Sequence, residues 1–128
     1  MPPSEPASQQ PEPAIEKAKL RKQAARNRSL LMTEHPSAGD DLTGHLDVVL
    51  GRCGRGVYAA YLPIRSELSP LPLVAALADR SIVTAMPVTP PPGNPLTFYR
   101  WAPGMRLDDG PYGTKQPPFN SERIIPDV

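Results

Sequence analysis

Proline is the feature that most constrains how this chain can fold. The sequence contains 19 prolines in 128 residues, about three times the usual share of ~5%. Each proline fixes φ and removes a backbone N–H donor, so it ends helices and interrupts the hydrogen bonding of strands. We therefore expect several short elements joined by stiff loops, except where a long segment carries no proline.

The first 32 residues divide into two segments of contrasting composition. Residues 1–14 contain five prolines and few apolar side chains, so they are predicted to form a disordered tail. Residues 15–32 contain no glycine or proline and are rich in Ala, Leu, Lys, Arg, Gln and Glu. This composition predicts a helix, which His35-Pro36 ends. Residues 15–128 are interpreted as one domain.

Shorter elements are expected in the rest of the chain. Apolar patterning predicts a helix over 41–50, a buried strand over 56–62, a helix over 71–78 and a strand over 82–88. A strand, a helix and a second strand form a βαβ unit, which implies a parallel sheet. A third strand is predicted over 96–101 from its alternating pattern. We expect residues 102–120 to be irregular and 121–128 to begin another strand.

Charge and cysteine content exclude several classes of partner. The 14 Lys and Arg residues nearly balance the 13 Asp and Glu residues, leaving a net charge of +1, so neither nucleic acid nor an acidic membrane is expected as a partner. The single Cys53 cannot form an internal disulfide, and no metal-ligand spacing surrounds it. No apolar run approaches the ~18 residues of a membrane span, and the start of the chain lacks the features of a signal peptide. These features favour a cytoplasmic protein, and no metal bound by its own side chains is expected.

Three cations of the first predicted helix lie on one face. At about 100° per residue, Lys17, Arg21 and Arg28 fall within a stripe roughly 40° wide. A rigid stripe of cations suits a polyphosphate, because Arg supplies forked donors and Lys supplies a point charge. The alternative is an ordinary solvated basic face, and the spacing alone does not decide between the two.

Glu67 stands at a position where α/β proteins commonly bind ligands. It follows the predicted strand 56–62 and precedes the predicted helix 71–78, at the carboxyl end of a parallel strand. Its carboxylate there could accept hydrogen bonds from a ring N–H or an amino group of a ligand. The alternative is a capping role, in which the acid offsets the dipole of the following helix.

Six short motifs follow one another between Lys17 and Val128. They are Lys17-Ala18-Lys19-Leu20-Arg21, a Y-x-P-x-x-x-E pattern over 61–67, Ala85-Met86-Pro87-Val88, Pro95-Leu96-Thr97-Phe98, Leu107-Asp108-Asp109-Gly110 and Pro126-Asp127-Val128. In this order and at this spacing the motifs resemble the N-terminal portion of the 5-formyltetrahydrofolate cyclo-ligase family, also called methenyltetrahydrofolate synthetases.

The resemblance implies a fold and a reaction. The fold would be α/β, with three layers and a mostly parallel sheet flanked by helices, similar to NagB, RpiA and CoA transferases. The reaction would be the ATP-dependent conversion of 5-formyltetrahydrofolate to 5,10-methenyltetrahydrofolate, with Mg²⁺ present and with release of ADP and phosphate. The complete protein would be a monomer.

The resemblance also implies the residues that bind each substrate, although it assigns no catalytic residue. ATP would be bound by Lys17, Ala18, Lys19, Leu20 and Arg21. The reduced folate would be bound by Leu62 through packing, by Glu67 through hydrogen bonds to the pterin, and by Tyr112 through stacking.

The sequence departs from the family pattern in two places. Thr114 and Lys115 stand where the turn after the aromatic residue usually has Ile and Pro. The family's glycine-rich G-x-G-x-G-Y-Y-D segment, which wraps the nucleotide phosphates, does not occur in this sequence. We therefore expect impaired activity in a truncated product, unless a second chain supplies that segment. A different alternative is a proline-rich interaction module without catalysis, in which Pro90-Pro91-Pro92 and the N-terminal tail present polyproline II surfaces.

Overall fold

The structure is a computed structural model that describes residues 12–128. Most of the predicted N-terminal tail lies outside the described residues, but Glu12 to Ala14 are helical. Helix α1 (Glu12–Glu34) therefore begins three residues before its predicted start at Ile15, and the predicted tail boundary is wrong. Pro13 is tolerated because the N–H groups of a first helical turn have no acceptor within the helix. The helix ends as predicted, where the His35 N–H donates to the Leu31 carbonyl (2.8 Å) just before Pro36.

Three short helical segments replace the single helix predicted over 41–50. They are α2 (Ala38–Asp41), the 3₁₀ helix η1 (Leu42–His45) and α3 (Leu46–Cys53). The Thr43 hydroxyl donates to the Asp40 carbonyl at 2.7 Å, and such local side-chain bonds compete with regular helix. At Gly39 a Cβ atom would lie 2.6 Å from the Ser69 carbonyl oxygen. The absence of a side chain at Gly39 thus allows α2 to approach the segment that precedes the next helix.

The predicted βαβ unit is present, with a shorter first strand. Strand β1 (Tyr58–Ala59) leads through helix α4 (Leu71–Asp79) to strand β2 (Thr84–Val88), and the two strands are parallel. The strand predicted over 56–62 shrinks to two residues because the chain leaves the sheet after Ala60, whose N–H still donates to Ala85 (3.0 Å).

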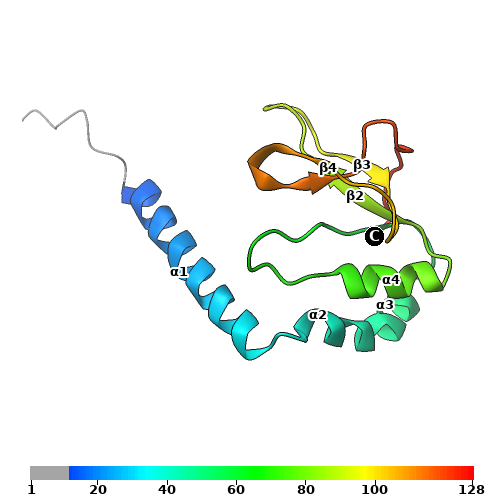
Figure 1. The fold of residues 1–128 in the computed structure, drawn as a ribbon, viewed down its shortest axis with the longest axis horizontal. Coiled ribbons are helices and arrows are strands. Elements are labelled where there is room, and N and C mark those ends of the chain that lie inside the picture. The colour runs from blue at the N-terminus through cyan, green and yellow to red at the C-terminus, as the bar shows by residue number, and fades with distance from the viewer. Residues whose placement is uncertain (1–11) are drawn as a thin grey trace, which may run out of the picture.

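Strand β3 (Thr97–Arg100) pairs with β2 in the antiparallel direction, so the sheet is mixed, in the order β1-β2-β3. The connection over 89–96 contains no helix. Parallel neighbours need a crossover of a dozen or more residues, so this short loop imposes the antiparallel pairing. The protein is thus mixed α/β, with helices α3 and α4 along one side of the sheet (Figure 1).

A small hairpin occupies part of the segment that was predicted to be irregular. Strand β4 (Asp108–Asp109) pairs with β5 (Lys115–Gln116) around the 3₁₀ turn η2 (Pro111–Gly113). The residues that indicated irregular structure instead form the hairpin turn, where Tyr112 (φ 60°) and Gly113 (φ 73°) adopt left-handed backbone conformations. Strand β5 contacts β2 of the main sheet.

The last residues lie against the main sheet without forming a full strand. Tyr99 and Arg123 form an isolated antiparallel bridge beside β3. The Asp127 N–H donates to the Val57 carbonyl (2.7 Å), and the Asp127 carboxylate accepts from the Val57 N–H (2.8 Å). The segment predicted to begin a strand is thus extended and hydrogen-bonded to the sheet.

Two buried clusters form the core between the sheet and the helices. One consists of Leu46, Tyr58, Leu77 and Ile82, and the other of Val74, Met86 and Trp101. Helix α4 contributes to both, which explains why its apolar side chains are needed on more than one face. Helix α1 contributes to neither and projects away from the sheet (Figure 1).

Within residues 12–128, no helix is long and apolar enough to cross a membrane. The same residues contain no cluster of three or more His, Cys, Asp or Glu side chains that could hold a metal ion.

Candidate functional site

The loop that follows β1 is closed by its own side chains. One Glu67 carboxylate oxygen accepts a hydrogen bond from the Ile64 N–H (2.8 Å), and the Glu67 N–H donates to the Ile64 carbonyl (3.1 Å). Arg65 adopts a left-handed conformation (φ 52°) inside this turn. A half-buried carboxylate is therefore held in one place at the carboxyl end of β1.

The structure does not support the capping alternative for Glu67. Helix α4 has no acidic residue in its first turn and begins after Pro70. The Ser69 hydroxyl, and not Glu67, accepts from the Leu71 N–H (3.3 Å) at this helix start. Glu67 thus orders the loop in front of the helix rather than the helix itself.

Tyr61 stabilises the same loop through its side chain. Its hydroxyl donates to the Leu68 carbonyl. Burial, and secondly the nearby Glu67 carboxylate, raises the pKa of the Tyr61 phenol, so the hydroxyl stays protonated and keeps this bond. Tyr61 opens the Y-x-P-x-x-x-E pattern, but sequence analysis assigned it no separate role.

Helix α1 meets this loop at one point. The Arg28 Nε donates to the Ser66 hydroxyl at 3.0 Å, in a partly buried position. Beside this bond lies a cavity of about 310 Å³, here called the α1–loop groove. It is lined by Arg28, Leu31, Met32, His35, Ala38, Ser66 and Leu68. Ser66 and Leu68, on either side of Glu67, line one side of the groove, and helix α1 lines the other.

The face of α1 that meets the loop is the face that carries the predicted cation stripe. At 100° per residue, Lys17 and Arg21 each lie about 20° from Arg28 around the helix axis. Arg21 stands about 10 Å further along the axis, towards the N-terminus. The contact of Arg28 with Ser66 therefore turns the Lys17 and Arg21 positions to the side on which the Glu67 loop lies.

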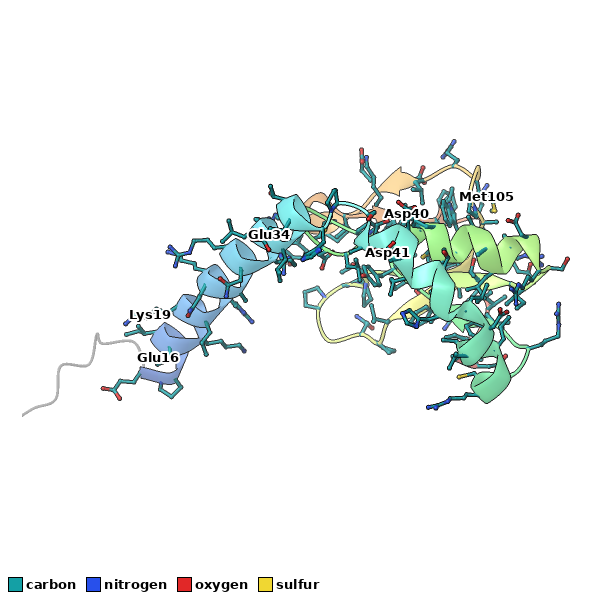
Figure 2. All side chains as sticks on the ribbon, turned by 90° about the horizontal axis from the view of Figure 1, so that it is seen from below. Glu16, Lys19, Glu34, Asp40, Asp41 and Met105 are labelled. Carbon is teal, nitrogen blue, oxygen red and sulfur yellow. The ribbon has the colours of Figure 1, made fainter. Side chains whose placement is uncertain are left out.

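The other predicted ATP-binding positions do not share this orientation. Lys19 lies about 180° from Arg28 around the axis, and its ammonium is 3.9 Å from the Glu16 carboxylate. Figure 2 shows Glu16 and Lys19 near the outer end of α1, away from the sheet. Ala18 and Leu20 are exposed on the same helix. Of the five positions, only Lys17 and Arg21 lie on the same side of helix α1 as Arg28.

The remaining predicted folate contacts occupy two other environments. Leu62 packs against the cluster of Val74, Met86 and Trp101, so it supports the core below the loop. Tyr112 is 84% exposed at the tip of the β4–β5 hairpin. It lines a separate cavity of about 540 Å³ with Pro111 and the proline loop over 89–92. Of the cation stripe only Arg28 lines the α1–loop groove, together with Ser66 and Leu68 on either side of Glu67, and Tyr112 lines a different cavity.

Sequence reasoning missed most of the residues that form the groove. Ser66, Met32 and His35 gave no motif signal, because their role depends on how α1 meets the loop in three dimensions. A weak signal was available for His35, which is seven residues after Arg28 and thus on the same face of the helix.

The fold and the groove define a mixed α/β protein with a cavity between helix α1 and the loop that follows its first parallel strand. Comparison with solved structures finds a similar fold in the NMR structure of Aquifex aeolicus 5,10-methenyltetrahydrofolate synthetase, with a TM-score of 0.59 and 24% sequence identity. The similarity covers 88% of this chain and 57% of that one, so the chain spans less than two thirds of the length of that protein. No protein-family model and no curated protein matches the sequence.

Proposed function

We propose that this chain carries part of a 5-formyltetrahydrofolate cyclo-ligase site, for the ATP-dependent conversion of 5-formyltetrahydrofolate to 5,10-methenyltetrahydrofolate. The fold similarity to a methenyltetrahydrofolate synthetase supports this reaction class, and so does the order of the six motifs. The observation that carries the proposal is the Arg28–Ser66 contact, which joins one cation of the α1 stripe to the residue that precedes Glu67. Arg28 and Ser66 both line the α1–loop groove.

The proposed chemistry explains why these residue types are needed. The formyl oxygen is a poor leaving group, so ATP first phosphorylates it; N10 then attacks the activated carbon, and phosphate departs. Lys17 and Arg21 would neutralise the charge of the phosphates as the phosphoryl group is transferred. Glu67 would accept hydrogen bonds from the N–H groups of the pterin, and its fixed position would align the formyl group with the nucleotide.

Leu62 and Tyr112 would have different roles in this proposal. Leu62 would hold the loop that carries Glu67 against the core, because it packs against the cluster of Val74, Met86 and Trp101. Tyr112 would stack on the folate only if the hairpin moved towards the groove, because it lines a different cavity in the described structure.

In this proposal Mg²⁺ would bind to the phosphates of the nucleotide and not to a set of protein side chains. The described part of the chain offers no group of three potential ligand side chains, and Mg²⁺ is commonly bound through substrate phosphates. Bound in this way, the ion would screen the charge of the transferring phosphoryl group. The proposal also includes a three-layer NagB-like fold for the complete domain, a cytoplasmic location and a monomer.

The alternative of a proline-rich interaction module has less support. The described residues bury two apolar clusters around a sheet, whereas a polyproline II ligand needs no core.

Titration of the chain with 5-formyltetrahydrofolate tests the proposal through Glu67→Gln. The glutamine oxygen can still accept from the Ile64 N–H, so the loop is kept while the charge is removed. We expect affinity to fall about tenfold, the loss associated with a charged hydrogen bond. Glu12→Gln, at an exposed acid in the first turn of α1, is the matched control. Equal affinity in both variants, or no binding by the folded chain, would overturn the assignment of Glu67.

A further inference from the structure

The wall of the α1–loop groove is almost entirely apolar. Helix α1 contributes Leu31 and Met32, helix α2 contributes Ala38, and the loop contributes Leu68. None of the residues that line the groove is acidic. Leu31 is 55% exposed, so part of this apolar wall is in contact with solvent. An apolar group that entered the groove would remove this surface and its own from water, which is favourable.

The groove lies beside the residue that would hold the pterin. Ser66 and Leu68 both line it, and Glu67 stands between them in the sequence. The Glu67 carboxylate is held by the Ile64 N–H at 2.8 Å. Because neighbouring Cα atoms are about 3.8 Å apart, a ligand with one part bound at Glu67 can place another of its parts in the groove.

The apolar wall discriminates between the parts of the proposed substrates. A pterin and an adenine both carry ring nitrogens and an amino group, and burial of these groups without hydrogen-bond partners is unfavourable. The glutamate tail of a folate is charged, so it is more stable in water. The aminobenzoyl ring, which joins the pterin to the tail, has apolar faces. Of these parts, the aminobenzoyl ring is therefore the one that the groove suits best.

The size of the groove and one of its side chains also suit an aromatic ring. The volume of about 310 Å³ is at the lower end of the range of small-molecule sites, so the groove can hold part of a folate but not the whole molecule. Met32 is half-buried and lines the groove. A thioether forms favourable contacts with aromatic rings, and the unbranched side chain of methionine adjusts to the shape of a ligand.

We propose that the α1–loop groove binds the aminobenzoyl ring of the reduced folate while Glu67 holds its pterin. This inference rests on the proposed function and adds to it a separate subsite for the middle of the substrate. Met32 and Ala38 would then determine specificity, because their contacts favour a folate over a free pterin. The glutamate tail would extend into solvent, and no acidic residue of the groove would repel its carboxylates.

The methionine methyl groups provide a direct measurement. The sequence contains four methionines, which ¹³C-methyl labelling makes visible by NMR. Met32 lines the groove, whereas Met86 is 0% exposed in the core and Met105 is 45% exposed outside the groove. With 5-formyltetrahydrofolate bound, we expect nuclear Overhauser effects between the aminobenzoyl protons and the Met32 methyl group. The methyl groups of Met86 and Met105 are internal controls and should show none.

A variant that fills the groove tests the same subsite with a pair of matched ligands. Ala38→Leu places a larger side chain on the wall of the groove and should weaken the binding of 5-formyltetrahydrofolate about tenfold. The same variant should bind 5-formyl-6-methyltetrahydropterin, which has the pterin but no aminobenzoyl ring, within about twofold of the parent chain. Ala24→Leu, at an exposed position of α1, is the control and should bind both ligands as the parent chain does.

The outcomes separate this inference from the proposed function. If 5-formyltetrahydrofolate binds and Glu67→Gln weakens it, but the ligand shows no nuclear Overhauser effect to Met32, the subsite is wrong and the proposed function stands. Equal effects of Ala38→Leu on the two ligands, or no effect on either, would also overturn the subsite. No binding of 5-formyltetrahydrofolate to the folded parent chain would overturn the proposed function and the subsite together.

Discussion

Helices α1 and α4 are stabilised in different ways. Helix α4 has nine residues and buries Val74 and Leu77 in the core. Helix α1 has 23 residues and buries none. Most short helices in proteins depend on packing for stability, as α4 does. Helix α1 instead combines length with good helix formers and a local contact at Ser66, so its side chains remain available for ligands.

The largest expected effect is on the core helix. Leu77→Ala should lower the free energy of unfolding by about 2–5 kcal/mol, because it leaves a cavity at a side chain that is 4% exposed. Leu20→Ala in α1, at a side chain that is 62% exposed, should change it by less than about 0.5 kcal/mol. Urea unfolding of both variants measures the comparison. Similar losses would show that α1 is packed as α4 is.

The close approach of α2 to Ser69 gives the next effect. Gly39→Ala places a Cβ 2.6 Å from a backbone oxygen, so we expect a loss of about 1–3 kcal/mol from overpacking. Gly51→Ala in α3 meets nothing within 4 Å and should stabilise the protein by about 0.5–1 kcal/mol. Thermal unfolding compares the two. A neutral Gly39→Ala would mean that α2 is not held against Ser69.

Loss of the contact between α1 and the loop should have a smaller and more local effect. Ser66→Ala removes the acceptor of the Arg28 bond and should cost about 1 kcal/mol. Amide hydrogen exchange is expected to speed up in the last turns of α1 and in the Glu67 loop, while α4 keeps its protection. Ser29→Ala, whose carbonyl and not its hydroxyl accepts from Thr33, serves as the control. Unchanged exchange in α1 would contradict the idea that this bond orients the helix.

The smallest expected effect concerns Tyr61 and pH. Its pKa is raised above the ordinary value of 10.0, so the folded state favours the protonated phenol. That contribution to stability is fully present below pH 10 and is lost as pH rises through the folded-state pKa. Tyr61→Phe should therefore lose less stability than the parent chain between pH 9 and 11 in urea unfolding. An equal or steeper loss would show that folding does not raise the pKa of Tyr61.

Sequence patterns located the elements that depend on local composition. The run without proline or glycine predicted α1, and the apolar segments flanking α4 predicted the βαβ unit. The patterns failed where tertiary contacts decide the structure. Strand β1 is shorter because the chain leaves the sheet after Ala60 and enters a loop that is closed by hydrogen bonds between Ile64 and Glu67. The β4–β5 hairpin was missed because its glycines and prolines read equally well as irregular loop.

The candidate site was predictable only where it depends on local sequence patterns and not on tertiary contacts. Lys17, Arg21 and Arg28 share a face by helical periodicity alone, and Glu67 follows from its place after a strand. Neither pattern could show that helix α1 contacts the loop that carries Glu67, because this contact is the Arg28–Ser66 bond between residues 38 positions apart.

Titration with Mg·ATP tests the central claim that one face of α1 serves a nucleotide site. Lys17→Ala with Arg21→Ala removes two charges from the groove side. Lys22→Ala with Arg26→Ala removes two charges from positions about 120° and 160° from Arg28 around the same helix. We predict that the first pair weakens binding about tenfold or more and that the second changes it by less than about twofold. Equal losses in the two double variants, or no ATP binding by the folded parent chain, would contradict the account.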